Sequence, residues 1–382
     1  MKFVNTRGHR SAGRILALSA FVFALPMGAN AQWQVIYLQP AGATSSGAIG
    51  VADGQQVGGA TVGGISCAGV WSGSAKSWVN LHPVGMARSS TFGVEGGLVA
   101  GVVIDAAGAH HASLWSRTGA LWMWEDVDNS GATISYAHDV DNGQVVGFAG
   151  EGAGSFHARL WYCAGDSWVW VDLNPPGATE SKAYGADGGR QVGYVADADG
   201  VRHASVWNGN AESCVDLNPD GAEHSSASDV DGDQIVGSAR VGQGGACLWN
   251  RAGDSWVWVG LQPPGVNGSS AWAVDRGEQV GHVVNIDWRA ALWRGTADSY
   301  VDLHAFLPRD FEWSLAAGIS HDAGYTCVVG YGYNGKRQRQ EALMWRAAYS
   351  TPPTPAETGT NQMGCVLVSP RQPSSPKPVG EI

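Results

Sequence analysis

Apolar and polar residues alternate over short stretches along most of the chain, and Gly-rich turn sequences separate these stretches. Two-residue alternation is typical of half-buried β-strands, and Asp-Gly or Asn-Gly steps are typical of tight hairpin turns. No long stripe with helical period follows the first 30 residues. The pattern therefore predicts an all-β chain, in which one representative unit has strands at 183–186, 191–194, 203–207 and 214–217.

This four-strand pattern repeats along the chain. Each third strand ends in a tryptophan, usually with an alanine three residues before it, at spacings of 44, 46, 46, 42, 44 and 52 residues. Units of about 45 residues with four strands are typical of propeller blades. The sequence thus predicts a seven-bladed β-propeller with four strands per blade. The repeated tryptophans are Trp71, Trp115, Trp161, Trp207, Trp249, Trp293 and Trp345. A Val-Gly or Ala-Gly step recurs at Gly58, Gly101, Gly147, Gly193, Gly237, Gly281 and Gly330.

The last repeat lacks a fourth strand, because Pro-rich sequence follows Trp345. The N-terminal segment Trp33 to Pro40 (WQVIYLQP) is an aligned copy of Trp168 to Pro175 (WVWVDLNP). We expect this segment to complete the last blade, since that closure leaves no free sheet edge. The predicted domains are a signal peptide at 1–31, a propeller at 32–349 and a flexible Pro-rich tail at 350–382.

The first 31 residues have the order of a secretory signal. Four basic residues between Lys2 and Arg14 precede the apolar run Ile15 to Leu25, and Ala29-Asn30-Ala31 follows as a cleavage site. The apolar run is shorter than the roughly 20 residues that span a bilayer. We therefore expect a secreted protein, extracellular or periplasmic, without membrane insertion.

The formal net charge is −11, and removal of the predicted signal peptide would make it more negative. Such a charge argues against a nucleic-acid partner. The six cysteines form no CxxC pair, so the spacing of a zinc site is absent. We expect no metal or other cofactor, a monomer, and cysteines that act mostly as small buried residues, with disulfide pairing left open.

Three third strands share a short motif: HASLW from His111, HARLW from His157 and HASVW from His203. The sequence from 33 to 346 resembles the extracellular repeat family named for its His-Ala-Phe triplet. Ser or Arg replaces the Phe here. The resemblance implies an exported repeat protein of undefined activity. The histidine itself is replaced at Cys67, Gly245, Arg289 and Glu341.

Other polar residues recur once per repeat, which favours structural roles. We expect the serines that begin each inner strand to bond neighbouring backbone, the acidic turn residues to form Asx turns, and the third-strand histidines to make surface or inter-blade hydrogen bonds. The repeated tryptophans are expected in the inter-blade core. The serines are Ser46, Ser89, Ser135, Ser181, Ser225, Ser269 and Ser314. The acidic residues are Asp53, Glu95, Asp141, Asp187, Asp231, Asp275 and Asp322.

Residues that break the repeat are the candidates for function. Three tryptophans have no counterpart in other repeats, and they fall in the last two repeats, where charged loops also occur. Irregular loops on a rigid scaffold commonly carry binding sites. An alternative is that these residues only cover the closing blade. The predicted ligand-binding residues are Trp272, Trp288, Trp313, Arg289, Asp310 and Glu312.

The leading functional prediction is a non-enzymatic binding or scaffold module for a glycan or protein ligand, with no catalytic residues. The alternative is a polysaccharide hydrolase or lyase on a propeller. It would need two carboxylates about 5 to 9.5 Å apart, for which Asp310 and Glu312 are the only non-repeated pair. A third possibility is a purely structural surface-layer component.

Overall fold

The computed structural model describes residues 33–150 and 156–348. The chain divides into two units, Met1–Ala31 and Gln32–Ile382, and every described residue belongs to the second. The predicted signal peptide and the predicted tail at 350–382 lie outside the described residues. Within the described ranges the elements are β-strands and short 3-10 turns, and no helix there is long and apolar enough to cross a membrane.

The strands form antiparallel groups of four, which we number as sheets 1 to 7. Sheets 2 and 3 are joined by one parallel bridge between His110 and Ile134. Sheets 1 to 3 contain β2 (Ser45–Ala52), β3 (Gln55–Val62), β4 (Ile65–Trp71) and β5 (Val79–Asn80); β6 (Arg88–Glu95), β7 (Leu98–Ile104), β8 (His110–Thr118) and β9 (Leu121–Asp126); and β10 (Ile134–Asp141), β11 (Gln144–Gly150), β12 (Phe156–Ala164) and β13 (Ser167–Asp172).

Sheets 4 to 7 follow the same order along the chain, except that the last one contains the first strand of the protein. They contain β14 (Glu180–Asp187), β15 (Arg190–Ala196), β16 (Arg202–Trp207) and β17 (Val215–Asp216); β18 (Ser225–Asp231), β19 (Gln234–Ala239), β20 (Gly245–Ala252) and β21 (Ser255–Gly260); β22 (Gly268–Asp275), β23 (Glu278–Val284), β24 (Trp288–Trp293) and β25 (Val301–Asp302); and β26 (Phe311–Asp322), β27 (Tyr325–Asn334), β28 (Arg339–Ala348) and β1 (Gln34–Tyr37). The 3-10 turns are Ala75–Ser77, Ala211–Ser213, Ala297–Ser299 and Leu303–Phe306.

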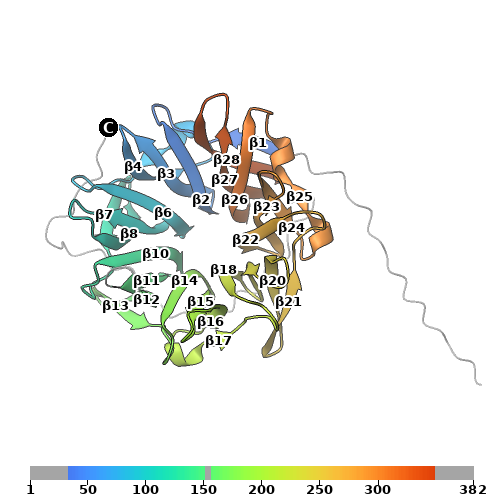
Figure 1. Ribbon diagram of the computed structural model, residues 1–382. Helices are drawn as coiled ribbons and strands as arrows, with labels where there is room; N and C mark the ends of the chain where they lie inside the picture. The colour runs from blue at the N-terminus through green and yellow to red at the C-terminus, as the bar shows by residue number, and fades with distance from the viewer. Residues whose placement is uncertain (1–32, 151–155, 349–382) are drawn as a thin grey trace, which may run out of the picture. The chain divides into compact units, whose positions relative to one another are not determined.

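The first strand of each sheet lies nearest a common centre (Figure 1). Each of these inner strands contacts the inner strand of the next sheet, and β26 of sheet 7 contacts β2 of sheet 1. Strand β1 pairs antiparallel with β28, with Val35 opposite Trp345. The four-strand prediction for 183–217 is confirmed, although the strands of sheet 4 are mostly longer than predicted. The described structure is therefore an all-β, propeller-like arrangement.

The recurring glycine in each second strand is required by a bulge in the inner strand. Inner strands shift register at this bulge, for example between Ala183 and Gly185 in β14. A Cβ on Gly193 would overlap the carbonyl oxygen of Lys182, and a Cβ on Gly281 would overlap that of Ser270. No larger residue fits there without moving the inner strand.

The core lies between consecutive sheets, and the repeated tryptophans are its largest members. All seven are at most 1% exposed, which confirms their predicted packing role. Trp249, for example, packs with Val192 and Val206 of sheet 4, and its indole N–H donates to the carbonyl of Leu217 at 2.8 Å. The core cluster around Trp71 joins residues of sheets 7 and 1 in the same way.

The repeated serines bridge neighbouring sheets, as predicted. Ser225 at the start of β18 accepts a hydrogen bond from the backbone N–H of Ala204 in β16 at 2.9 Å and donates to Oδ1 of Asn218 at 2.6 Å. Equivalent bonds to the alanine of the preceding third strand are made by Ser46, Ser89, Ser135, Ser181, Ser269 and Ser314. The alanine of the repeat motif therefore marks a backbone group that must be bonded from the next sheet.

The acidic turn residues do not form the predicted Asx turns within their own hairpins. Asp187, for example, accepts a hydrogen bond from the backbone N–H of Gly232, in the corresponding turn of the next sheet, at 2.8 Å. Asp322 does not belong to the series, because the hairpin of sheet 7 is longer by two residues on each strand and Ser320 occupies the equivalent place. Equivalent bonds from backbone N–H groups of the next sheet are accepted by Asp53, Glu95, Asp231 and Asp275.

Candidate ligand-binding surface

The three unrepeated tryptophans gather into one row of aromatic rings across sheets 6 and 7. The ring of Trp288 stacks on His282, with centroids 5.2 Å apart, and meets the edge of Trp313 at 6.3 Å. Trp272 meets His282 at 5.3 Å. Tyr331 and Tyr333 of β27 extend the row beyond Trp313, each at 6.1 Å. The structure thus brings together the predicted tryptophans, through a histidine that the sequence did not single out.

Alternation along the strands explains how this row forms. His282 and Val284 share one face of β23, and Trp288 lies opposite Val284 in the antiparallel pair with β24. Burial lowers the pKa of His282 to about 4, so the imidazole is neutral near pH 7. The row is therefore an uncharged aromatic surface.

Trp288 is the ring of the row that solvent reaches most. Its side chain is 47% exposed, and Ile286, two residues earlier in the β23–β24 turn, is 92% exposed. Trp272 and Trp313 are half-buried. A large half-exposed indole supported from behind by other rings is a preformed platform for a ligand, because little ordering of side chains is needed on binding.

The charged residues predicted for the site are engaged elsewhere or lie apart from the row. Arg289 donates to Asp302 of the neighbouring fourth strand at 3.2 Å. Asp310 forms an ion pair with Lys336 at 3.9 Å. Glu312 is exposed, directly precedes Trp313 at the start of β26, and has its carboxylate beside Gly335. No hydrogen bond, ion pair or cation–π contact among the described residues joins these three side chains to Trp288.

A second aromatic group in sheets 2 to 4 was missed by the sequence analysis, which considered only tryptophans. His138, at the bulge of β10, stacks on Phe92 of β6 at 5.0 Å and meets the edge of Tyr184 of β14 at the same distance. Tyr136 and Phe148 belong to the same group. Burial lowers the pKa of His138 to about 4. Bulky residues at the bulge of consecutive inner strands are the sequence pattern that would have revealed it.

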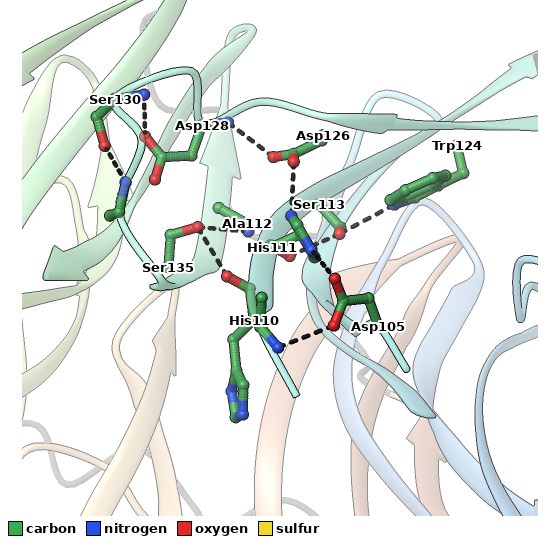
Figure 2. A network of polar contacts seen from close by, with 12 residues as sticks. Asp105, His110, His111, Ala112, Ser113, Trp124, Asp126, Asp128, Ser130 and Ser135 are labelled. Carbon is green, nitrogen blue, oxygen red and sulfur yellow. Dashed lines mark hydrogen bonds and ion pairs between the residues drawn. The ribbon is translucent and has the colours of Figure 1, made fainter. Parts of the chain in front are cut away.

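The third-strand histidines make surface hydrogen bonds, one of the two alternatives predicted, and their partners are aspartates of their own sheets. His111 Nδ1 lies 2.8 Å from Oδ2 of Asp126 in the fourth strand of its own sheet, and its Nε2 lies 3.4 Å from Asp105 (Figure 2). Nδ1 of His157 lies 2.8 Å from Oδ2 of Asp172, and the equivalent pair in sheet 4 is His203 with Asp216. The recurrence of this pair indicates a structural bond between third and fourth strands.

The described residues contain no group of three or more His, Cys, Asp or Glu side chains arranged to hold a metal ion. Cys67 and Cys247 are buried, Cys214 and Cys327 are half-buried, and Cys163 is exposed, so the prediction of small buried residues holds for some of them. Burial raises the pKa of the Cys214 thiol to about 11. Thiolate chemistry is therefore disfavoured at that position.

An all-β arrangement of four-stranded sheets around a centre defines the class of a propeller-like protein. No protein-family model and no curated protein matches the chain. Among solved structures, a puromycin hydrolase is 10% identical with a TM-score of 0.52, covering 82% of this chain and 55% of that chain. A prolyl endopeptidase is 12% identical with a TM-score of 0.50, covering 78% and 48%.

The chain therefore spans about half the length of the peptidase chains that it matches. TolB from Acinetobacter baumannii is 10% identical over 78% of each chain, with a TM-score of 0.42. At these identities the likeness to the two peptidase chains shows the fold alone.

Proposed function

We propose that this protein is a seven-bladed propeller, closed by β1, that acts as a non-enzymatic binding module for glycan chains. The pairing of β1 with β28 and the contact between β26 and β2 support the closure. The observation that carries the function is the exposed ring of Trp288, which stands in a row with two other tryptophans, whereas the aromatic group of sheets 2 to 4 contains no tryptophan.

A glycan suits this surface because sugar rings present C–H faces that pack on indoles. The row spans two sheets and crosses from Trp272 to Tyr333, so several rings line one path. The lowered pKa of His282 keeps its imidazole uncharged near pH 7, so the aromatic surface suits ligands that pack through apolar C–H faces rather than through charge. The predicted export of the protein would place this surface among extracellular or periplasmic polysaccharides.

A glycan-array screen of the protein beginning at Gln32 tests the proposal. Each stacking indole should contribute on the order of 1 kcal/mol or more, so replacing Trp288 and Trp313 together by Ala should weaken binding at least tenfold. Trp170→Ala is the matched control, because Trp170 is 39% exposed but belongs to the repeated fourth-strand pattern and is covered by Arg159 at 3.7 Å. Its binding should be unchanged.

Two outcomes would contradict the proposal. A blank array followed by capture of a protein ligand on the same surface would replace the glycan by a protein partner. Unchanged glycan affinity in the double variant would place the site elsewhere. If the double variant instead unfolds, Trp288→Ala alone decides the question, because the greater exposure of Trp288 makes it the less important of the two for packing.

A further inference from the structure

Sheet 5 contains a cavity of about 290 Å³ that the aromatic row does not use. It lies between strands β20 and β21 and the two loops that lead into β20 and β22. Its walls include the indole of Trp258, the rings of Pro263 and Pro264, and the amides of Gln243 and Gln262. No Asp, Glu, Lys, Arg or His side chain is among the lining residues.

The cavity exists because sheet 5 lacks both members of the bond between third and fourth strands. Gly245 stands where His203 stands in sheet 4, opposite the end of the second strand. Gly260 stands where Asp216 stands, opposite the middle of the third strand. Two glycines thus replace a histidine and an aspartate, and the space of both side chains is left open.

One hydrogen-bond donor in this cavity has lost the partner that its counterparts have. The residue after the fourth strand donates to the carbonyl four residues later in other sheets, as Asn218 does to Ala222 at 3.4 Å and Gln39 to Ala43 at 2.7 Å. Gln262 is the equivalent residue in sheet 5. Its Oε1 accepts from Ser269 at 3.1 Å, but no described residue accepts a hydrogen bond from its Nε2. The amide N–H of Gln262 is therefore available to a ligand.

We propose that this cavity binds a single uncharged pyranose ring. The absence of ionisable lining residues selects an uncharged ligand, and the flat apolar walls of Trp258 and the prolines suit the C–H face of a sugar. A ring or hydroxyl oxygen would accept from Gln262. The volume lies just below the roughly 300 to 1,000 Å³ of common small-molecule pockets, so one ring rather than a longer chain fits. The inference does not rest on the tryptophan surface.

Saturation-transfer NMR with the protein from Gln32 onward tests this binding. The probes are methyl β-glucopyranoside, methyl β-galactopyranoside and N-acetylglucosamine, with glucuronate as the charged control. At least one neutral probe should show transfer and glucuronate should not. The filled variant Gly245→His with Gly260→Asp and Gln262→Asn rebuilds the arrangement of sheets 3 and 4, and should weaken binding at least tenfold.

The filled variant needs Gln262→Asn, because a Cβ on Gly245 would overlap the Gln262 side chain. If it does not fold, Gly260→Val narrows the cavity alone, since a Cβ there would lie in ordinary contact, 3.5 Å from the Trp258 ring. In the variant with Trp288 and Trp313 replaced by Ala, the sugar binding that the filled variant loses should remain. The inference is overturned if no neutral probe binds, or if binding survives in the filled and Gly260→Val variants. Loss of sugar binding in the tryptophan variant alone would also overturn it, while leaving the proposed function intact.

Discussion

The serine bridge allows a sharp test of how neighbouring sheets are held together. Ser225→Ala removes the acceptor of the Ala204 N–H and the donor to Asn218, without adding atoms. Ser225 is 1% exposed and Ala204 is fully buried, so water cannot replace the lost acceptor. We expect the free energy of unfolding to fall by about 1 to 3 kcal/mol, the usual cost of an unsatisfied buried donor.

Urea unfolding followed by far-UV circular dichroism measures this change, and the neighbouring residue supplies the control. Ser226 is half-buried and makes only a long 3.4 Å contact to the carbonyl of Ala227, so Ser226→Ala should change stability by less than about 0.5 kcal/mol. Ser89→Ala, at another junction, should cost as much as Ser225→Ala and add to it, because the two share no partner. Equal effects of Ser225→Ala and Ser226→Ala would refute the bridging role.

Two further predictions concern closure and pH. A chain that starts at Ala41 loses β1 and the buried Leu38, which leaves the edge of β28 unpaired; it should unfold earlier than the chain from Gln32 in a thermal scan, and an unchanged melting temperature would refute the closure. Burial raises the pKa of Glu95 from 4.5 to about 7. Between these two pH values the folded state therefore keeps a proton that the unfolded state releases. The contribution of Glu95 to the free energy of unfolding is thus lost as the pH rises from about 4.5 to 7. Glu95→Gln should flatten that decline in urea unfolding at pH 4.5 and 7.5, whereas a slope equal to that of the original protein would contradict the assignment.

The sequence predicted those parts of the fold in which the recurrence of a residue in every repeat is enough to assign its role. A tryptophan or serine at one place in every repeat needs no knowledge of neighbours to be assigned to packing or bridging, and both assignments are confirmed. The second-strand glycine was recognised as a landmark, but its cause was not visible. It depends on a bulge that brings the inner-strand carbonyl against it, which only coordinates reveal.

One assignment was wrong, and another left the partner open, because in both cases the partner lies in another hairpin or strand. Asp187 was expected to bond within its own turn, but turns of consecutive sheets lie side by side and the next turn offers a free N–H. His203 was expected to bond at the surface or between blades, and it bonds at the surface, to Asp216, which the antiparallel register brings beside it. That bond had a sequence signal, because an aspartate follows in each repeat that has the histidine.

Sheet 5 lacks both the histidine and the aspartate of this pair, so the sequence also identifies sheet 5 as an exception. This exception is of a different kind from the unrepeated tryptophans. Trp288 is an addition to the pattern, and an added indole on a surface invites a ligand by its chemistry alone. Gly245 and Gly260 stand in place of a hydrogen-bonded histidine and aspartate. Replacing only one of the two side chains would leave the other as an unpaired polar group, whereas replacing both leaves an uncharged space. The N–H of Gln262 then supplies a hydrogen-bond donor that fixes the orientation of a ligand, while the apolar walls contribute affinity. Two independent departures from one repeat, in sheet 5 and in sheets 6 and 7, are therefore expected to respond to different substitutions.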